Sequence, residues 1–448
     1  MAASIKSVPS AAVLEAAKAR FLARNPNSLR LHKEAALSMP GGNTRTVLHT
    51  APFPVSMSRG EGYRLYSEDG HTYTDLTAEY TAALLGHSHP RLLSAITSTL
   101  HDTGLSLGAS TRHDAALAHA LCARFRLARA RFCPSGTEAN LHALAAARAH
   151  TGRSKVVVFA GGYHGGVLAF PAPHGIATPS TVDRGRWVVG RFNDDARGVR
   201  EVVMREKGGE DVAAVLVEGM QGAAGCVPGR KDFLLAAREA AREAGAVFVL
   251  DEVMTSRMGR RGLQGEPGLE LEPDLTTFGK WLGGGLAFGA FGGREDVMAV
   301  FDPTREGEGA LAQSGTFNNN SLAMRAGLVA LTEVFTKDVA EEFMRVGEAF
   351  LRRLREVTAG TKATFTGVGT VLCLHVTDEG VRDIVRAGEI EERDDLKDIF
   401  WMEMMEEGFW ITRRGMIALI LGTPESELDR FVECVKAFLE RHRDLMAL

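Results

Sequence analysis

Residues 246–285 read AVFVLDEVMTSRMGRRGLQGEPGLELEPDLTTFGKWLGGG and contain two short apolar runs. The first run, residues 247–250, ends at Asp251, and the second, residues 275–278, is followed by a glycine and Lys280. Short apolar runs of this kind are typical of strands buried inside a parallel sheet. The carboxyl ends of parallel strands lie at one edge of the sheet, where ligands bind. We therefore expect Asp251 and Lys280 to face the same crevice.

An acid and an amine in one pocket are the groups that pyridoxal 5′-phosphate requires. The amine forms a Schiff base with the aldehyde of the cofactor, and the carboxylate keeps the pyridinium nitrogen protonated. The alternative interpretation is a surface ion pair at the ends of two loops. The other motifs of the chain have to decide between these two interpretations.

The composition indicates a globular chain without a polyanionic partner. The 448 residues are enough for a large core and two domains, and a formal net charge of −4 does not favour nucleic-acid binding. No stretch approaches the roughly 18 apolar residues of a membrane span, and the first residues lack an apolar signal region. The five cysteines are odd in number and include no CxxC pair, which argues against disulfides and against a metal site. We expect a cytoplasmic protein with no membrane partner.

The order of predicted elements indicates an α/β fold with a second, smaller domain. After residue 90, helical patterns alternate with brief apolar runs, which is the signature of stacked strand–helix units and a mainly parallel sheet. We predict an N-terminal segment (residues 1–65) that packs with the small domain, a large domain (66–336), and a small C-terminal α+β domain (337–448). The predicted strands of the large domain are residues 130–133, 156–159, 212–217, 246–250 and 275–278.

The sequence patterns that indicate helices and strands are weaker near the two ends of the chain. Residues 10–25 are predicted as a helix that stops at Asn25-Pro26-Asn27, and residues 53–76 as an antiparallel meander. The acid-rich stretch 389–398 is predicted to be a solvated helix or loop face. Further helices are expected at 338–357 and 426–443, and short strands at 363–365, 371–376, 409–412 and 417–421.

The sequence PSGTEAN (134–140) follows a predicted strand and opens an alanine-rich helix. Ser135 and Glu138 have the spacing of a capping box, so a helix should begin here. The free N–H groups of Gly136 and Thr137, together with the helix dipole, would bind an anion such as a phosphate. An ordinary capped helix is the alternative.

Four further side chains are expected near the same crevice. Tyr163, within GGYHGG (161–166), could stack on a planar ring or be a packed turn tyrosine. Gln221, after the strand at 212–217, could donate to a cofactor oxygen or face water. Met254 could pack on the other face of the ring or belong to the core. Thr316, within SGTFNNN (314–320), has a hydroxyl and an N–H suited to phosphate, although an Asn-rich helix cap explains this motif equally well.

Arg45 and Arg414 are candidates for carboxylate recognition, because a guanidinium group grips a carboxylate with two hydrogen bonds. Most arginines of this chain must lie on the surface, so the residue type alone does not select these two.

Together these motifs resemble the class III aminotransferases of pyridoxal-phosphate fold type I, and most of all the branch of the β-phenylalanine aminotransferases, with glutamate-1-semialdehyde 2,1-aminomutase as a neighbour. The segments MPGGNTR, SGTEAN, GGYHGG, DEVMTSR, TTFGKWLGGG and SGTFNNN occur in the order of that family and span essentially the whole chain. The resemblance implies a mainly parallel seven-stranded sheet, pyridoxal 5′-phosphate as cofactor, and a homodimer with shared sites.

The resemblance also implies a role for each site residue. Lys280 would be the Schiff-base lysine and proton carrier, and Asp251 the partner of the pyridine nitrogen. Tyr163 and Met254 would sandwich the ring. The phosphate would be held by Ser135, Gly136, Thr137 and, from the neighbouring subunit, Thr316.

For the substrates, the resemblance implies that Arg45 binds the carboxylate of a β-amino acid such as β-phenylalanine. Arg414 would bind the α-carboxylate of an acceptor such as 2-oxoglutarate or pyruvate. The aminomutase, which is an isomerase, and a lyase or racemase on the same fold remain alternatives. A nicotinamide-dependent dehydrogenase is disfavoured, because no G-x-G-x-x-G follows the first strand with an acid about 20 residues on.

Two departures from the family pattern bear on these expectations. Gly219 stands where many relatives have proline after the glutamate, which would loosen the turn that carries Gln221. Residues 167–180 read VLAFPAPHGIATPS, where the aminomutases usually carry a longer lid, and this favours a transaminase.

Overall fold

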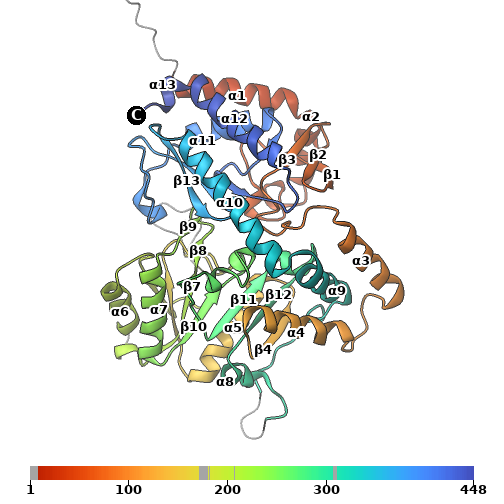
Figure 1. The fold of residues 1–448 in the computed structure, drawn as a ribbon, viewed down its shortest axis with the longest axis vertical. Coiled ribbons are helices and arrows are strands. Elements are labelled where there is room, and N and C mark those ends of the chain that lie inside the picture. The colour runs from red at the N-terminus through yellow and green to blue at the C-terminus, as the bar shows by residue number, and fades with distance from the viewer. Residues whose placement is uncertain (1–8, 171–179, 181, 206, 306–309) are drawn as a thin grey trace, which may run out of the picture.

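The computed structural model describes residues 9–170, 180, 182–205, 207–305 and 310–448. A seven-stranded sheet with helices on both faces fills one half of the molecule, and a second group of helices and strands fills the other half (Figure 1). The strand order is β4-β12-β11-β10-β7-β5-β6; β12 runs antiparallel to both of its neighbours, and the remaining pairs are parallel. The strands are β4 (Arg129–Cys133), β5 (Lys155–Phe159), β6 (Trp187–Gly190), β7 (Val212–Glu218), β10 (Val247–Asp251), β11 (Leu275–Gly279) and β12 (Gly289–Gly293). The helices around this sheet are α3 (Pro90–Asp102), α4 (Arg112–Phe125), α5 (Gly136–Thr151), α6 (Ala196–Met204), α7 (Lys231–Ala244), α8 (Glu295–Met298) and α9 (Ser321–Val329).

Alternate side chains of the central strands pack against helices on opposite faces of the sheet. Val156 and Val158 of β5 belong to the same apolar cluster as Ala143 of α5. Val157, between them, belongs to the cluster that contains Phe233 of α7. Successive residues of a strand point to opposite faces, so a strand covered on both faces must be apolar throughout. This is why these strands read as continuous apolar runs.

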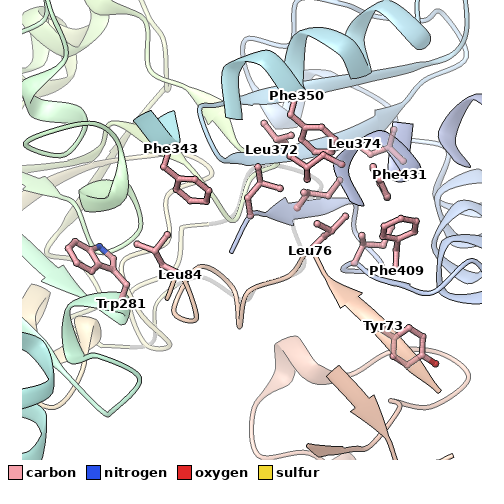
Figure 2. Packing of buried hydrophobic residues seen from close by; sticks show 14 of the residues in the cluster. Tyr73, Leu76, Leu84, Trp281, Phe343, Phe350, Leu372, Leu374, Phe409 and Phe431 are labelled. Carbon is pink, nitrogen blue, oxygen red and sulfur yellow. The ribbon is translucent and has the colours of Figure 1, made fainter. Parts of the chain in front are cut away.

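The N-terminal meander and the C-terminal elements form the other half of the molecule. β3 pairs in parallel with β15, with Thr74 opposite Phe409, and this joins the two ends of the chain in one four-stranded sheet. Leu76, Leu372 and Phe431 lie in the core that these elements share (Figure 2). The strands are β1 (Met57–Glu61), β2 (Arg64–Ser67), β3 (Thr72–Asp75) and β15 (Phe409–Trp410), then β13 (Ala363–Val368), β14 (Val371–Val376) and β16 (Met416–Ala418) in a three-stranded sheet, and the β8 (Met220–Gln221) and β9 (Val227–Pro228) pair.

The helices of this half are α1 (Ser10–Arg24), α2 (Pro26–Ala35), α10 (Lys337–Val357), α11 (Asp394–Glu406), α12 (Glu425–Arg441) and α13 (Arg443–Met446). No helix in the described ranges is long and apolar enough to cross a membrane. The domain boundaries at residues 65 and 336 stay a prediction.

The predicted mainly parallel sheet is confirmed, and each of the five predicted strands is present as β4, β5, β7, β10 or β11. Two strands of the sheet, β6 and β12, were not predicted. β12 reads GAFGG, and a glycine-rich run carries no strand signal. The helix at residues 10–25 does stop before Pro26, but Pro26 is the first residue of a second helix, a position that proline favours.

The prediction of a solvated face over residues 389–398 is wrong at its C-terminal end. Lys397 and Asp398 are only 7% and 9% exposed. Asp398 accepts two hydrogen bonds from Arg413, and Lys397 pairs with Glu392 at 3.1 Å. Each of these two charges is paired with an opposite charge from the same half of the molecule.

Candidate active site

Asp251, at the end of β10, is a buried carboxylate held by three donors. Its Oδ2 atom lies 2.8 Å from Asn140 Nδ2 and 2.8 Å from His164 Nδ1, and its Oδ1 atom accepts the Val253 N–H at 2.9 Å. Asn140 is held in turn, since its Oδ1 atom accepts a hydrogen bond from Thr277 at 2.8 Å. The strand end, helix α5 and the GGYHGG loop therefore fix this carboxylate in one orientation.

Lys280 follows β11 and has a left-handed backbone with φ of 57°. Its Nζ atom donates to the carbonyl oxygen of Tyr80 at 2.8 Å and to the hydroxyl of Thr81 at 3.0 Å. Burial lowers the pKa of Lys280 to about 8, although the charges of Asp251 and Glu218 raise it. An amine with this pKa is present in both protonation states near neutral pH, as proton transfer requires.

A capped helix begins at Gly136, as the sequence predicts, and its role as an anion site stays a prediction. The Ser135 side chain caps the helix by accepting the Glu138 N–H at 3.2 Å, which is one half of the predicted capping box. The Gly166 N–H donates to the Thr137 hydroxyl at 3.3 Å. A Cβ atom at Gly165 would lie 2.3 Å from Thr137 Oγ1, so only glycine allows the GGYHGG loop to approach the helix start this closely.

Glu218 connects the loops that carry Tyr163 and Gln221. Its carboxylate accepts the Tyr163 N–H at 2.9 Å and the Gly222 N–H at 3.2 Å. Burial raises the pKa of Glu218 to about 7. The ring of Tyr163 is 48% exposed and available for stacking, whereas Gln221 is buried and donates from Nε2 to the Ala160 carbonyl at 3.0 Å.

The turn that carries Gln221 is held firmly despite Gly219. The Gly219 carbonyl accepts the Gly229 N–H at 2.9 Å, and β8 pairs with β9 just beyond it. A Cβ at Gly219 would lie 2.5 Å from Leu263 Cδ2, so close packing replaces the stiffness of a proline. Met254 packs below this turn, since a Cβ at Gly222 would lie 2.2 Å from its Cε atom.

Arg45 and Arg414 both lie beside the ring of Tyr80. Their guanidinium carbons are 5.7 Å and 5.6 Å from its centroid. Arg45 is exposed and pairs with Glu79. Arg414 has no carboxylate partner in the part of the chain that the structure describes: its Nη2 faces the sulfur of Met416 at 3.5 Å, and its Nε is buried without a partner.

Thr316 lies on an exposed turn before α9. Its role from a neighbouring subunit stays a prediction. The segment 167–180, expected to be shorter than an aminomutase lid, falls largely outside the described residues.

The donor set of the crevice fits pyridoxal 5′-phosphate. A carboxylate with fixed orientation suits the pyridine nitrogen, a lysine of lowered pKa suits the aldehyde, and the capped start of α5 suits the phosphate. The residues that would hold these three groups are Asp251, Lys280, Ser135, Gly136 and Thr137.

Two features of the site were missed from the sequence. Asn140 lies on α5 and His164 in the GGYHGG loop, both inside motifs that were singled out, but neither was assigned a contact with Asp251. The turn at residues 78–81 carries no turn-forming residue and gave no signal.

Comparison with known proteins agrees with this geometry. The model of the class III aminotransferases matches residues 47–425. An uncharacterised aminotransferase of Schizosaccharomyces pombe is 44% identical over 97% of both chains. The β-phenylalanine transaminase of Variovorax paradoxus is 43% identical, covering 95% of this chain and 96% of its own. Its crystal structure superposes with a TM-score of 0.92 over 98% of this chain and 99% of that one. A glutamate-1-semialdehyde 2,1-aminomutase of Pelotomaculum thermopropionicum is 32% identical over 91% of this chain and 96% of its own.

Proposed function

Since the chain belongs to the class III aminotransferases, we propose that it transfers the amino group of an aromatic β-amino acid such as β-phenylalanine to an α-keto acid such as 2-oxoglutarate or pyruvate. The enzyme is a pyridoxal-phosphate-dependent transaminase. The observation that carries the choice of substrates is the pair of arginines beside Tyr80, one of which lacks a carboxylate partner among the described residues. The similarity to the transaminase of V. paradoxus supports the β-amino donor.

When bound, the cofactor supplies an electron sink for the carbon that carries the amino group. Asp251 holds a proton at the pyridine nitrogen, and Asn140 and His164 keep its carboxylate aimed there. The Lys280 amine, with its pKa of about 8, would take the proton from the substrate carbon and deliver it to the cofactor carbon that receives the amino group. Tyr163, whose ring is 48% exposed, would cover one face of the cofactor ring.

The two arginines provide separate binding positions for the carboxylates of two substrates of different shape. A β-amino acid and an α-keto acid hold their carboxylates at different distances from the reacting carbon. With Arg45 for the former and Arg414 for the latter, one cofactor position serves both half-reactions. Charge-assisted, two-point hydrogen bonds are strong enough for this selection.

The experiment is a donor panel run on Arg45→Ala and Arg414→Ala, with and without 2-oxoglutarate. Arg45→Ala should raise KM for β-phenylalanine about tenfold or more and change KM for an α-amino donor far less. Arg414→Ala should raise KM for 2-oxoglutarate. Arg59→Ala, which removes an exposed arginine paired with Glu61 at 3.3 Å, is the matched control. Equal losses for both donor types in Arg45→Ala would overturn the assignment.

The same panel separates the enzyme from an aminomutase, which the 32% identity to that enzyme keeps as the second candidate. An aminomutase keeps the amine within one molecule and converts glutamate-1-semialdehyde without an added keto acid. Turnover of β-phenylalanine that depends strictly on the acceptor supports the transaminase. A lyase or racemase would act on the donor alone.

We also propose a cytoplasmic homodimer. The five cysteines are all free thiols, as in a reducing compartment. Thr316 and the 63% exposed Phe317 share a surface turn that a second copy would cover. Mixed dimers of Lys280→Ala and Thr316→Ala subunits test this arrangement. They regain activity if Thr316 acts in its neighbour's site, and stay inactive if it acts in its own.

A further inference from the structure

Four successive residues that are not glycine adopt left-handed backbone conformations next to the active-site lysine. The φ angles of Ala78, Glu79, Tyr80 and Thr81 are 47°, 48°, 53° and 80°. Residues with a Cβ atom visit this region singly and at a cost, and for a β-branched residue such as Thr81 it is a true outlier. Strain of this kind persists only where the surroundings impose it, and it gathers at functional sites.

A buried carboxylate at the end of β3 holds this left-handed turn in place. Asp75, 1% exposed, accepts the N–H groups of Thr77 at 2.7 Å and Ala78 at 3.0 Å through Oδ1. Its Oδ2 atom faces His87 Nε2 at 3.0 Å. The Ala78 carbonyl accepts the Ala83 N–H at 2.9 Å, which closes the turn. The strain is therefore sustained by a dedicated set of hydrogen bonds.

The left-handed turn places two acceptors together in front of Lys280. The carbonyl oxygen of Tyr80 and the hydroxyl of Thr81 receive the Nζ atom at 2.8 Å and 3.0 Å. Thr81 is fully buried, at 0% exposure. Among the described residues, these two oxygens are the hydrogen-bond acceptors of the amine.

We propose that the 78–81 turn is the docking place of the Lys280 amine whenever that amine is not joined to the cofactor, and that Thr81 is its positioning residue. The proposal rests on the role of Lys280 in the proposed function. The turn would keep the free amine at a fixed point, from which it takes a proton from the substrate carbon and delivers it to the cofactor carbon that receives the amino group. The same turn places Glu79 and Tyr80 beside Arg45. One strained element therefore contacts both the Lys280 amine and the arginine proposed to bind the substrate carboxylate.

The test measures the Lys280 amine directly in enzyme loaded with pyridoxamine 5′-phosphate, in which the lysine is free. Competitive acylation with acetic anhydride across pH, read by peptide mass spectrometry, gives the titration midpoint of this amine. The charged groups around the amine are Asp251, Glu218, Arg414 and Arg257, and all stay unchanged in the variants. Because the Thr81 hydroxyl accepts from the amine and favours its charged form, Thr81→Val should lower the midpoint by about half to one pH unit.

Two variants serve as matched controls. Thr81→Ser keeps the hydroxyl and should titrate like the wild type. Thr276→Val removes a buried hydroxyl of β11 that has no hydrogen-bond partner among the described residues, and it should also titrate like the wild type. A shift in Thr81→Val alone supports the proposal. An unchanged midpoint in Thr81→Val, or the same shift in Thr276→Val, overturns it.

A crystal structure of the wild-type enzyme in the same pyridoxamine form decides the matter even if Thr81→Val fails to fold. Lys280 Nζ within hydrogen-bond distance of both Tyr80 O and Thr81 Oγ1 supports the docking place, and an amine directed elsewhere overturns it. Borohydride fixation of pyridoxal 5′-phosphate on Lys280 tests the role of the lysine separately. A failure of the proposed function is therefore distinguishable from a failure of this inference.

Discussion

His164 Nδ1 lies 2.8 Å from Asp251 Oδ2, and both side chains are buried. This contact ties the GGYHGG loop to the end of β10. Through the same oxygen atom Asp251 also accepts from Asn140 on α5. The carboxylate that would face the pyridine nitrogen is therefore oriented by groups from two other segments, as expected where one charge must act at one atom.

Replacing Asp251 should affect the reaction more than replacing the residues that orient it. Asp251→Asn keeps the size of the side chain and removes its charge, so we expect kcat/KM to fall by about a hundredfold or more. His164→Phe removes one donor to the carboxylate and should cost about tenfold. Steady-state kinetics with saturating cofactor measures both. A larger loss in His164→Phe than in Asp251→Asn would contradict this ranking.

Covalent loading of Lys280 with pyridoxal 5′-phosphate should increase with pH around a midpoint near 8. Burial lowers the pKa of this amine to about 8, and only the unprotonated amine attacks the aldehyde. The fraction of enzyme molecules in which the unprotonated amine reacts rapidly with the aldehyde should be small at pH 6 and close to one at pH 9. Borohydride trapping followed by peptide mapping measures it, with Lys280→Arg as the control that traps nothing at this position. A midpoint above pH 10 would show that the amine is not desolvated.

The sequence predicted the structure best where the burial of a segment can be read from a short run of neighbouring residues. The strands before Asp251 and Lys280 are covered on both faces, so they appear as apolar runs, and the side chains at their ends could be assigned to one crevice. The 78–81 turn could not be predicted, because Ala-Glu-Tyr-Thr contains none of the residues that favour a left-handed backbone. Its conformation is imposed by Asp75, and tertiary hydrogen bonds of this kind leave no local pattern.

The pairing partners of charged residues were also beyond prediction. The stretch 389–398 looks like a solvated surface because it is rich in acids, yet Asp398 is buried against Arg413, and the half-buried Glu392 pairs with the buried His375. Charge content alone does not say whether water or an opposite charge satisfies a carboxylate. That depends on which segments the fold brings together.

Glu79 should compete with the substrate for Arg45. The two side chains form an ion pair, and they are 54% and 45% exposed, so a substrate carboxylate can displace Glu79 at little cost. Glu79→Gln should lower KM for β-phenylalanine about two- to fivefold and leave KM for 2-oxoglutarate unchanged. Glu61→Gln, which breaks the comparable surface pair with Arg59, is the control. A higher KM for β-phenylalanine in Glu79→Gln would mean that Glu79 positions Arg45 and does not compete with the substrate.

Glu392 should stabilise the fold in a pH-dependent way through two buried partners. Its carboxylate lies 2.7 Å from His375 Nδ1 and 3.1 Å from Lys397 Nζ. Burial alone would raise the pKa of Glu392, but the hydrogen bond from His375 and the charge of Lys397 outweigh it and lower this pKa to about 2. Burial lowers the pKa of His375, but the nearby Cys373 and the hydrogen bond to Glu392 outweigh it and raise this pKa.

The signs of these two shifts define the pH window. A lowered acid pKa gives stability that is present above the unfolded value of about 4.3 and is lost as pH falls towards the folded value. A raised histidine pKa gives stability that is present below about 6.5 and is lost as pH rises through the folded value. Glu392→Gln should therefore lower the free energy of unfolding by about 2–3 kcal/mol near pH 6, with a smaller difference at pH 3 and at pH 9. Chemical denaturation across this range measures it, and Glu391→Gln, at an exposed neighbouring position, is the control. A difference that does not vary with pH would show that Glu392 acts through packing and not through its charge.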